Sequence, residues 1–358
     1  MYDFGLAMLN SNYKVINCKK GPRPTNQKRI YFIIWKYNLY YFKAAFWYCA
    51  LFGFKPLAYR GLETGNRLIA SHAVQQGKII FVFESALLPC CKKIGAHVAH
   101  HGDGVKDIAF QVENIEWIIE KARSKGAKIL SEVSEESDEY GFVKTASLQT
   151  YGDTVHTLIE RRNYNGVFLP GFRKHNMKTE LFDKLPQVGL HFIDHCVGNQ
   201  AEHQMEITVK WYENVLGFHR FWSVDDSIIH TEYSALRSVV VTNAQETIKM
   251  PINEPATGRK AISQIQEFVD FYGGAGVQHI ALNTTDIIQA ITALKARGME
   301  FLQIPEVYYK TLRKKLQSAK VKGFGAGNFK ALFESIEMEQ NERGNLFYTN
   351  VVDGGERI

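Results

Sequence analysis

The sequence lacks the patterns that mark several protein classes. Its five cysteines form no CxxC pair and no even framework, so we expect reduced thiols and a cytoplasmic location rather than a disulfide scaffold. The formal net charge of +6 is small for 358 residues, and no long run of lysine or arginine concentrates it. Nucleic-acid binding therefore gains little support.

Long uncharged hydrophobic runs are also missing. The most aromatic stretch, residues 29–54, is interrupted by Lys36 and Lys43. Its longest uncharged run is too short to cross the roughly 30 Å hydrocarbon core of a bilayer. The N-terminus has no signal-peptide layout either. We therefore expect neither a membrane protein nor a secreted one.

The chain does contain a long internal repeat. GDGVKDIAFQVENIEWIIEKARSKGAKIL, which starts at Gly102, matches GAGVQHIALNTTDIIQAITALKARGMEFL, which starts at Gly274, without a gap. A second pair is WYCALFGF, from Trp47, and WYENVLGF, from Trp211. Each copy predicts a strand, an amphipathic helix ended by glycine, and further strands. A repeat of this period indicates duplicated structural units, two in each half of the chain.

The length and the repeat together predict two domains. We expect a poorly ordered extension over residues 1–28 and a first domain over 29–165. A mixed stretch with two prolines, residues 166–190, suits a linker, and the second domain follows over 191–358.

Two histidines, His195 and His279, are candidate metal ligands. In the repeat, His279 corresponds to Asp107 and His195 to Tyr31, so both histidines occur only in the second copy. Imidazoles that face inward from equivalent strands of two units would converge and supply two positions of a metal centre. From these residues alone, a metal site and a pair of packed histidines both remain open.

An iron site for oxygen chemistry typically adds one carboxylate to two histidines. In the first copy, a hairpin that turns at residues 151–153 leads into a last strand carrying Glu160. The second copy has no counterpart, because neither alternating strands nor a hairpin turn lies between Lys310 and Gly323. We therefore expect the fourth unit to lack its last two strands and the carboxylate on them.

Many separate motifs occur in an order that resembles one family. They include HGDGVKDIAF, LQTYGDTVHTLIE, IDHCVGNQ, RFWSVDD, SQIQEFVD, GGAGVQHIAL and GFGAGNFKALFESIEMEQNERGN. From about Phe42 to about Asn345 the chain resembles the animal 4-hydroxyphenylpyruvate dioxygenases. The resemblance implies an α+β vicinal-oxygen-chelate fold with four βαβββ units in two half-barrel domains. The fourth unit would be truncated, and a C-terminal helix would act as a lid.

The same resemblance implies a function. The expected enzyme is an Fe(II)-dependent dioxygenase that converts 4-hydroxyphenylpyruvate and O2 to homogentisate and CO2 in tyrosine and phenylalanine breakdown, acting as a homodimer. Motif by motif, it assigns iron binding to His195 and His279. It assigns catalysis to Gln264, Gln278 and Phe329. The same three residues are expected to bind the substrate together with Ser238, Asn253, Phe324 and Asn328.

Two departures from the family leave alternatives open. The family's segment before GFGAGNF is absent, and the chain before about Phe42 differs from the family's opening strand. A non-catalytic chain that keeps the fold and partners an intact subunit is therefore a second hypothesis. Hydroxymandelate synthase, which shares the iron ligands and substrate but releases a different product, is a rival within the enzymes.

Other polar residues are better explained by structure than by function. His97 and His101 have i, i+4 spacing, but they precede a glycine turn where we expect a loop without a metal. Asp194 is expected to point away from His195, because neighbouring strand residues face opposite sides. Three glutamates on a charged C-terminal helix are expected to be solvated rather than to replace the missing ligand: Glu334, Glu337 and Glu339.

Overall fold

The computed structural model describes residues 32–37, 41–89, 91–175, 179–224, 235–256 and 262–301. Every helix and strand in these ranges belongs to one compact unit, Lys20–Met299 with Val352–Ile358. The predictions for the N-terminal extension, for the truncation after Lys310 and for the C-terminal lid helix lie outside the described residues. None of the described helices is long and apolar enough to cross a membrane.

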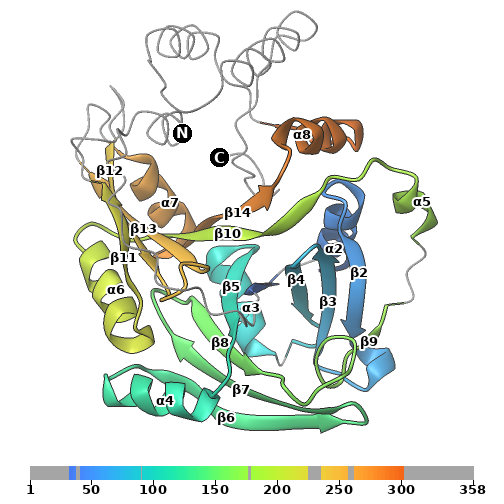
Figure 1. Ribbon diagram of the computed structural model, residues 1–358, viewed down its shortest axis with the longest axis horizontal. Helices are drawn as coiled ribbons and strands as arrows, with labels where there is room; N and C mark the ends of the chain where they lie inside the picture. Colours follow the sequence, from blue (N-terminus) through green and yellow to red (C-terminus); the bar gives the residue numbers. More distant parts are fainter. Residues whose placement is uncertain are drawn as a thin grey trace, which may run out of the picture. The chain divides into compact units, whose positions relative to one another are not determined.

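The first of two curled sheets has nine strands in the order β6-β7-β8-β5-β1-β4-β3-β2-β9 (Figure 1). Its strands are β1 Phe32–Tyr37, β2 Lys55–Arg60, β3 Ile69–Gln76, β4 Ile79–Ala86, β5 Gly104–Gln111, β6 Ile129–Asp138, β7 Gly141–Gln149, β8 Val155–Glu160 and β9 Arg173–Lys174. The helices in this part of the chain are α2 Tyr41–Ala50, α3 Lys92–His101 and α4 Ile115–Ser124, with a 3-10 turn at Leu62–Thr64.

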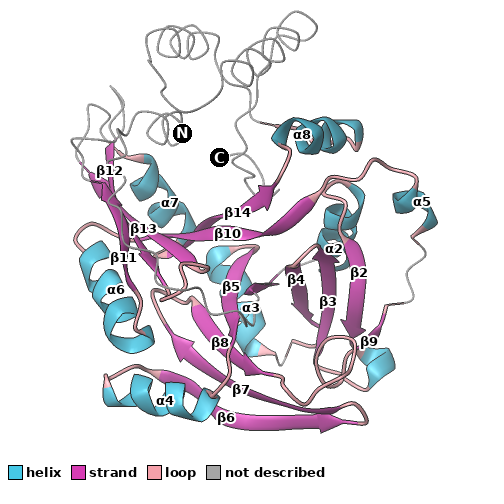
Figure 2. Ribbon diagram, in the orientation of Figure 1, coloured by secondary structure: helices cyan, strands magenta, loops and turns pink. Residues whose placement is uncertain are grey.

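The second sheet has five strands in the order β11-β12-β13-β10-β14 (Figure 2). Its strands are β10 Leu190–Asn199, β11 His219–Val224, β12 Ala235–Thr242, β13 Lys249–Ala256 and β14 Gly276–Thr284. The remaining helices are α5 Glu180–Asp183, α6 Met205–Trp211 continued by a π-turn at Tyr212–Leu216, α7 Gln264–Tyr272 and α8 Ile287–Ala296. Both β9 and α5 fall within the stretch expected to be a linker.

The duplication predicted from the sequence is visible in the strand pairing. In the first sheet, β1 pairs with β4 in parallel and with β5 antiparallel. In the second sheet, β10 pairs with β13 in parallel and with β14 antiparallel. Three complete βαβββ units are present, and β14 with α8 begins the fourth. The vicinal-oxygen-chelate architecture is thus confirmed as far as the described residues extend.

The repeated helices form for the reasons that their spacing indicates. Ile115, Ile119 and Ala122 of α4 are buried, as are Ala290 and Leu294 of α8. Each helix begins at a side-chain cap, because Asn114 accepts from the amide of Trp117 and Asp286 accepts from that of Gln289. Both helices end at a glycine of left-handed conformation, Gly126 and Gly298, with φ of 79° and 89°.

The loop expected around His97–His101 is wrong, because these residues form the second half of α3. Ile94, His97 and His101 share one buried face of this helix, at i, i+3 and i+7. Because two of the three buried positions carry histidine, the apolar pattern that marks a helix is weak in the sequence.

The buried side chain of His156 on β8 connects the first sheet to the π-turn at Tyr212–Leu216. Its Nδ1 donates to the carbonyl of Ile108 at 2.7 Å, and its Nε2 accepts from the hydroxyl of Tyr212 at 2.7 Å. Both His156 and Tyr212 are 0% exposed. Burial away from water favours the neutral ring, in which Nδ1 carries the hydrogen and Nε2 accepts from Tyr212.

This burial predicts a pH-dependent stability. Desolvation lowers the pKa of His156 to about 4, whereas a histidine in an unfolded chain titrates at about 6.5. Between these values the unfolded state binds more protons, so stability that is fully present above about pH 6.5 is lost as the pH falls toward 4, by up to about 3 kcal/mol. The substitution His156→Gln should make the denaturation midpoint less dependent on pH in this window. The exposed-residue control His219→Gln should keep the wild-type dependence, and an unchanged profile for His156→Gln would contradict the argument.

Candidate functional site

The structure brings His195 and His279 together on neighbouring antiparallel strands. His195 on β10 lies opposite Ala281 on β14, and Val197 lies opposite His279. Residues that lie directly opposite share a face of the sheet, and positions 279 and 281 are two apart, so both imidazoles project from the same face. Their ring centroids are 5.6 Å apart at an interplanar angle of 75°.

Each imidazole has an oxygen acceptor on its Nδ1 atom. His195 Nδ1 donates to Asp194 Oδ2 at 2.8 Å, and His279 Nδ1 donates to Gln278 Oε1 at 3.1 Å. The hydrogen bond from His195 holds the pKa of Asp194 below its usual value, so that carboxyl is an ionised acceptor. Nδ1 therefore carries the hydrogen in both rings, which leaves the Nε2 lone pairs available to a metal ion.

His279 is also held in the neutral form. Desolvation lowers its pKa to about 3, with a smaller contribution from the nearby His195. A metal ion binds the neutral imidazole, so no proton has to be displaced from His279 near neutral pH.

The expectation that Asp194 points away from His195 is wrong, and the reason is a β-bulge. On β14, Leu282 and Ala281 are adjacent, but their partners on β10 are Ile193 and His195. Asp194 is thus the extra residue of β10 and is freed from the strict alternation of the strand. It contacts His195 on one side, and its Oδ1 lies 3.4 Å from Lys249 Nζ on the other.

A second bulge places Gln278 beside His279. Val197 and Gly198 are adjacent on β10, whereas their partners on β14 are His279 and Val277. Gln278 is therefore the extra residue of β14, just as Asp194 is that of β10. The two irregularities flank the histidine pair, and each supplies the acceptor for one imidazole.

A row of buried polar residues crosses three strands on the same face as the histidines. Ser238 on β12 lies opposite Asn253 on β13, which in turn lies opposite Asn199 on β10. The three residues are at most 1% exposed, and Asn253 Nδ2 donates to Asn199 Oδ1 at 3.3 Å. Within the described residues, Asn253 Oδ1 and Asn199 Nδ2 have no hydrogen-bond partner. Leaving such atoms unpaired costs roughly 1–3 kcal/mol each, so the row is suited to a polar ligand group.

Two of these three residues, Ser238 and Asn253, are predicted by the family resemblance, and Asn199 is not. The available signal for Asn199 was its position four residues after His195 in one strand, which places it on the same face. Of the other candidates, Gln264 begins α7 and is half-buried, and α7 packs against β10, β13 and β14. Three predicted substrate residues lie outside the described residues: Phe324, Asn328 and Phe329.

In the described part of the chain, no carboxylate joins His195 and His279 in a group of three or more potential ligands. In the first copy, the carboxylate at the position expected for the third ligand belongs to Glu160. Its Oε2 accepts from the amide of Ile115, at the start of α4, at 2.9 Å. The place of the equivalent strand in the second copy falls after residue 301, beyond the described residues.

The bulge at Asp194 leads to a test by substitution. Asp194→Asn removes the charge that holds the Nδ1 hydrogen of His195, and losing such an orienting partner typically costs 10- to 100-fold in metal affinity. We expect a loss of this size in a calorimetric titration with Co²⁺. Glu202→Gln, which removes an exposed carboxylate after the same strand, should leave the affinity unchanged. Equal affinities for Asp194→Asn and the wild type would refute the orienting role.

Comparison with known proteins extends these observations. Residues 192–318 match the model of the Glyoxalase/Bleomycin resistance protein/Dioxygenase superfamily. A 4-hydroxyphenylpyruvate dioxygenase from Caenorhabditis briggsae is 57% identical over 361 aligned positions, which cover 87% of this chain and 92% of that protein. Another from Danio rerio is 50% identical and covers 91% of this chain and 95% of that protein.

The alignment with the Caenorhabditis briggsae protein also includes positions at which this chain has no residue. Since 87% of 358 residues is about 311, about 50 of the 361 aligned positions have no residue in this chain. This deficit is larger than one pair of strands, since β7 and β8 with their turn span only Gly141–Glu160.

A solved structure supports the fold. A triple mutant of 4-hydroxymandelate synthase from Streptomyces coelicolor matches with a TM-score of 0.68 at 22% identity, covering 86% of this chain and 98% of that one. At this identity the likeness concerns the architecture, which agrees with the repeated βαβββ units.

Proposed function

This chain belongs to the 4-hydroxyphenylpyruvate dioxygenase family, and we propose that it is an Fe(II)-dependent dioxygenase that converts 4-hydroxyphenylpyruvate and O2 to homogentisate and CO2. The observation that carries the proposal is the pair of imidazoles, His195 and His279, beside a row of buried hydroxyl and amide groups. The sequence relatives favour this enzyme over a non-catalytic partner subunit.

The donor set fits ferrous iron. Imidazole nitrogen is a common ligand of divalent iron, and two histidines with open positions are typical of sites that activate oxygen. Both Nε2 atoms have a free lone pair, because Asp194 and Gln278 accept the hydrogens on the opposite nitrogens. His195 and His279 are the residues that would hold the ion.

The sequence lacks the hairpin expected to carry the third ligand. With two protein ligands in place of three, the ion would be held more weakly, since each ligand adds to the binding free energy. We therefore expect this chain to lose iron readily to a chelator and to require added Fe(II) for activity.

When bound, iron supplies the redox chemistry that couples the decarboxylation of the α-keto acid to ring hydroxylation. The protein contributes binding and orientation. Ser238, Asn253 and Asn199 offer a hydroxyl and two amides, which can bind the phenol hydroxyl of the substrate without placing a charge beside the metal. Their burial keeps water from competing for these hydrogen bonds.

Further residues are proposed from the family resemblance. Gln278 would donate to the substrate through Nε2 while its Oε1 accepts from His279, and Gln264, the first residue of α7, would bind the substrate as well. Phe324, Asn328 and Phe329 would close over the substrate ring from the C-terminal helix. The resemblance also supports a homodimer in the cytoplasm.

The proposal is tested by incubating the full chain with Fe(II), ascorbate, 4-hydroxyphenylpyruvate and O2 and separating the products by chromatography. We expect homogentisate, one CO2 per O2 consumed, and a loss of roughly 100- to 1,000-fold in kcat for His195→Ala and for His279→Ala, the size of loss seen when one group that stabilises a transition state is removed. The control His191→Ala, on the same strand, should retain activity.

Other products would contradict the proposal in distinct ways. 4-Hydroxymandelate would assign the chain to the synthase reaction. No turnover at saturating Fe(II), with the substrate unchanged, would show that the chain does not catalyse the reaction.

A further inference from the structure

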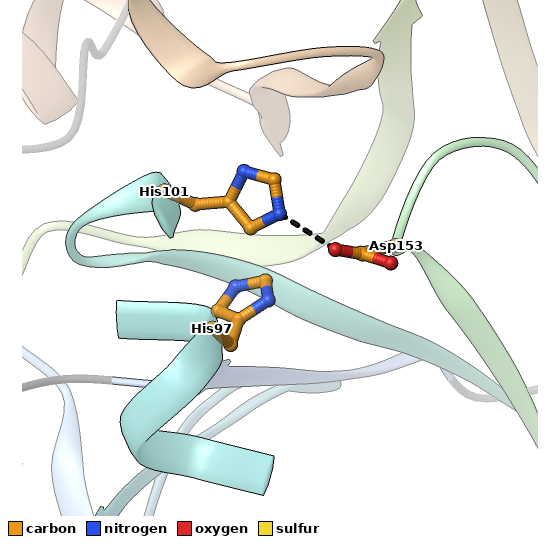
Figure 3. A group of neighbouring side chains, drawn as sticks. All are labelled: His97, His101 and Asp153. Carbon is orange, nitrogen blue, oxygen red and sulfur yellow. Dashed lines mark hydrogen bonds and ion pairs between the residues drawn. The ribbon is translucent and has the colours of Figure 1, made fainter. Parts of the chain in front are cut away.

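A second cluster of potential metal ligands lies in the first half of the chain. His97 and His101 project from one face of α3, and Asp153 reaches them from the turn between β7 and β8 (Figure 3). One ligand atom from each of the three side chains lies within 4.8 Å of the other two. It is the one group of three or more such residues in the described part of the chain.

The hydrogen bonds of His101 define which of its nitrogens faces the cluster. Its Nδ1 lies 2.6 Å from the carbonyl oxygen of Tyr272, which can only accept, so Nδ1 carries a hydrogen. Its Nε2 lies 2.9 Å from Asp153 Oδ2, and this contact holds the pKa of Asp153 below its usual value. In a neutral imidazole, Nε2 would direct a lone pair at an ionised carboxylate. This contact therefore requires a positive charge, which is either a second proton on His101 or a metal ion between Nε2 and the carboxylate.

His97 distinguishes between a second proton on His101 and a shared metal ion. The residue is 5% exposed, and neither of its ring nitrogens has a hydrogen-bond partner in the described part of the chain. A proton on His101 would leave both of these buried polar atoms unsatisfied, which is unusual and costly. A metal ion shared by the three residues would bind one nitrogen of His97 as well.

The protonation state of His97 suits this role. Desolvation, and after it the charge of Lys106, lower the pKa of His97 to about 4. The ring is therefore neutral near pH 7, which is the form that coordinates metals. Lys106 also donates to the backbone carbonyl of Asp153, so its charge opposes a cation at the cluster and limits the affinity.

We propose that His97, His101 and Asp153 bind a divalent transition-metal ion of the zinc class, separately from the histidine pair on β10 and β14. Two imidazoles and one carboxylate are common ligands of Zn²⁺, and the order of metal affinities places Zn²⁺ above Fe²⁺ for such a set. The side chain of Asp153 is 54% exposed, so it is free to turn, and water can reach the fourth position. The donor atoms around a tetrahedral zinc ion lie about 3.3 Å apart. The donor atoms of these three residues lie within 4.8 Å of one another, so small movements of the side chains would bring them to that spacing.

An ion at this site would link three elements that are distant in sequence, namely α3, the β7–β8 turn and α7. Next to the cluster, His100 contacts the carbonyl of Gly273 at 3.1 Å and His101 contacts that of Tyr272, both at the C-terminal end of α7. The ring of Tyr272 stacks on that of His101, with centroids 4.2 Å apart. An ion at this position would fix the β7–β8 turn to α3, and through α3 to α7. The inference does not depend on the proposed enzymatic function.

The test uses the full chain carrying His195→Ala and His279→Ala, so that the other histidine pair cannot bind metal. Zn²⁺ alone is titrated into the chelator-treated protein, and binding is followed by competition with a chromophoric chelator and by the thermal midpoint. We expect one Zn²⁺ per chain, a rise in the midpoint on binding, and at least a 10-fold loss of affinity for His97→Gln and for Asp153→Asn. Fe²⁺ should bind more weakly than Zn²⁺.

The matched control is His100→Gln, which alters the adjacent histidine of the same helix and should leave the Zn²⁺ affinity unchanged. Asp153→Asn lies on an exposed turn and keeps the test valid should His97→Gln fail to fold. The inference is overturned by the absence of stoichiometric Zn²⁺ binding in the double-alanine background. It is equally overturned by Zn²⁺ affinities that do not respond to His97→Gln and Asp153→Asn.

Discussion

The candidate active site depends on two β-bulges that interrupt the pairing of β10 with β14. A regular antiparallel pair would turn Asp194 and Gln278 to the face opposite their neighbours His195 and His279. One extra residue in each strand instead places a carboxylate and an amide oxygen beside the two imidazoles. The Nδ1 hydrogens are thereby held, and both Nε2 atoms are left for a metal. The buried polar row from Ser238 to Asn199 projects from the same face.

The first copy has the corresponding irregularity on β5 but different side chains. Trp35 and Lys36 of β1 pair with Asp107 and Val105, so Lys106 is the extra residue of β5, at the position equivalent to Gln278. Asp107 replaces His279, and its carboxylate is bound by the amide and hydroxyl of Thr157. Burial raises the pKa of Asp107 to about 7. The duplicated backbone is thus retained, while this half carries no imidazole pair at the equivalent position of β5.

The sequence predicts the scaffold better than the details of the site. The repeat predicts the three complete units, because glycine turns and helical spacing are local signals. Comparing the copies also singles out His195 and His279, since each has a different residue in the other copy. The role of Asp194 is missed because a bulge reverses the alternation from which its direction was inferred. The grouping of Asp153 with His97 and His101 is missed because it depends on the packing of residues that are more than 50 positions apart.

The polar row shows the same limit. Ser238 and Asn253 are predicted by family resemblance, whereas nothing in the sequence states that they face each other across β12 and β13. Register is a long-range property of strand pairing, and a shift of one residue would reverse every side chain in the row. The spacing of Asn199 from His195 places both on one face of β10, but its position beside Asn253 is known only from the register of β10 with β13.

Anomalous X-ray diffraction would test whether the bulged pair of strands, β10 and β14, holds the proposed iron. Crystals of the Fe(II)-loaded chain, grown without oxygen, would be measured on both sides of the iron absorption edge. We expect an anomalous peak about 2.1 Å from Nε2 of both His195 and His279, with their Nδ1 atoms turned toward Asp194 and Gln278. A peak bound through Nδ1, or iron found only elsewhere in the chain, would contradict this expectation.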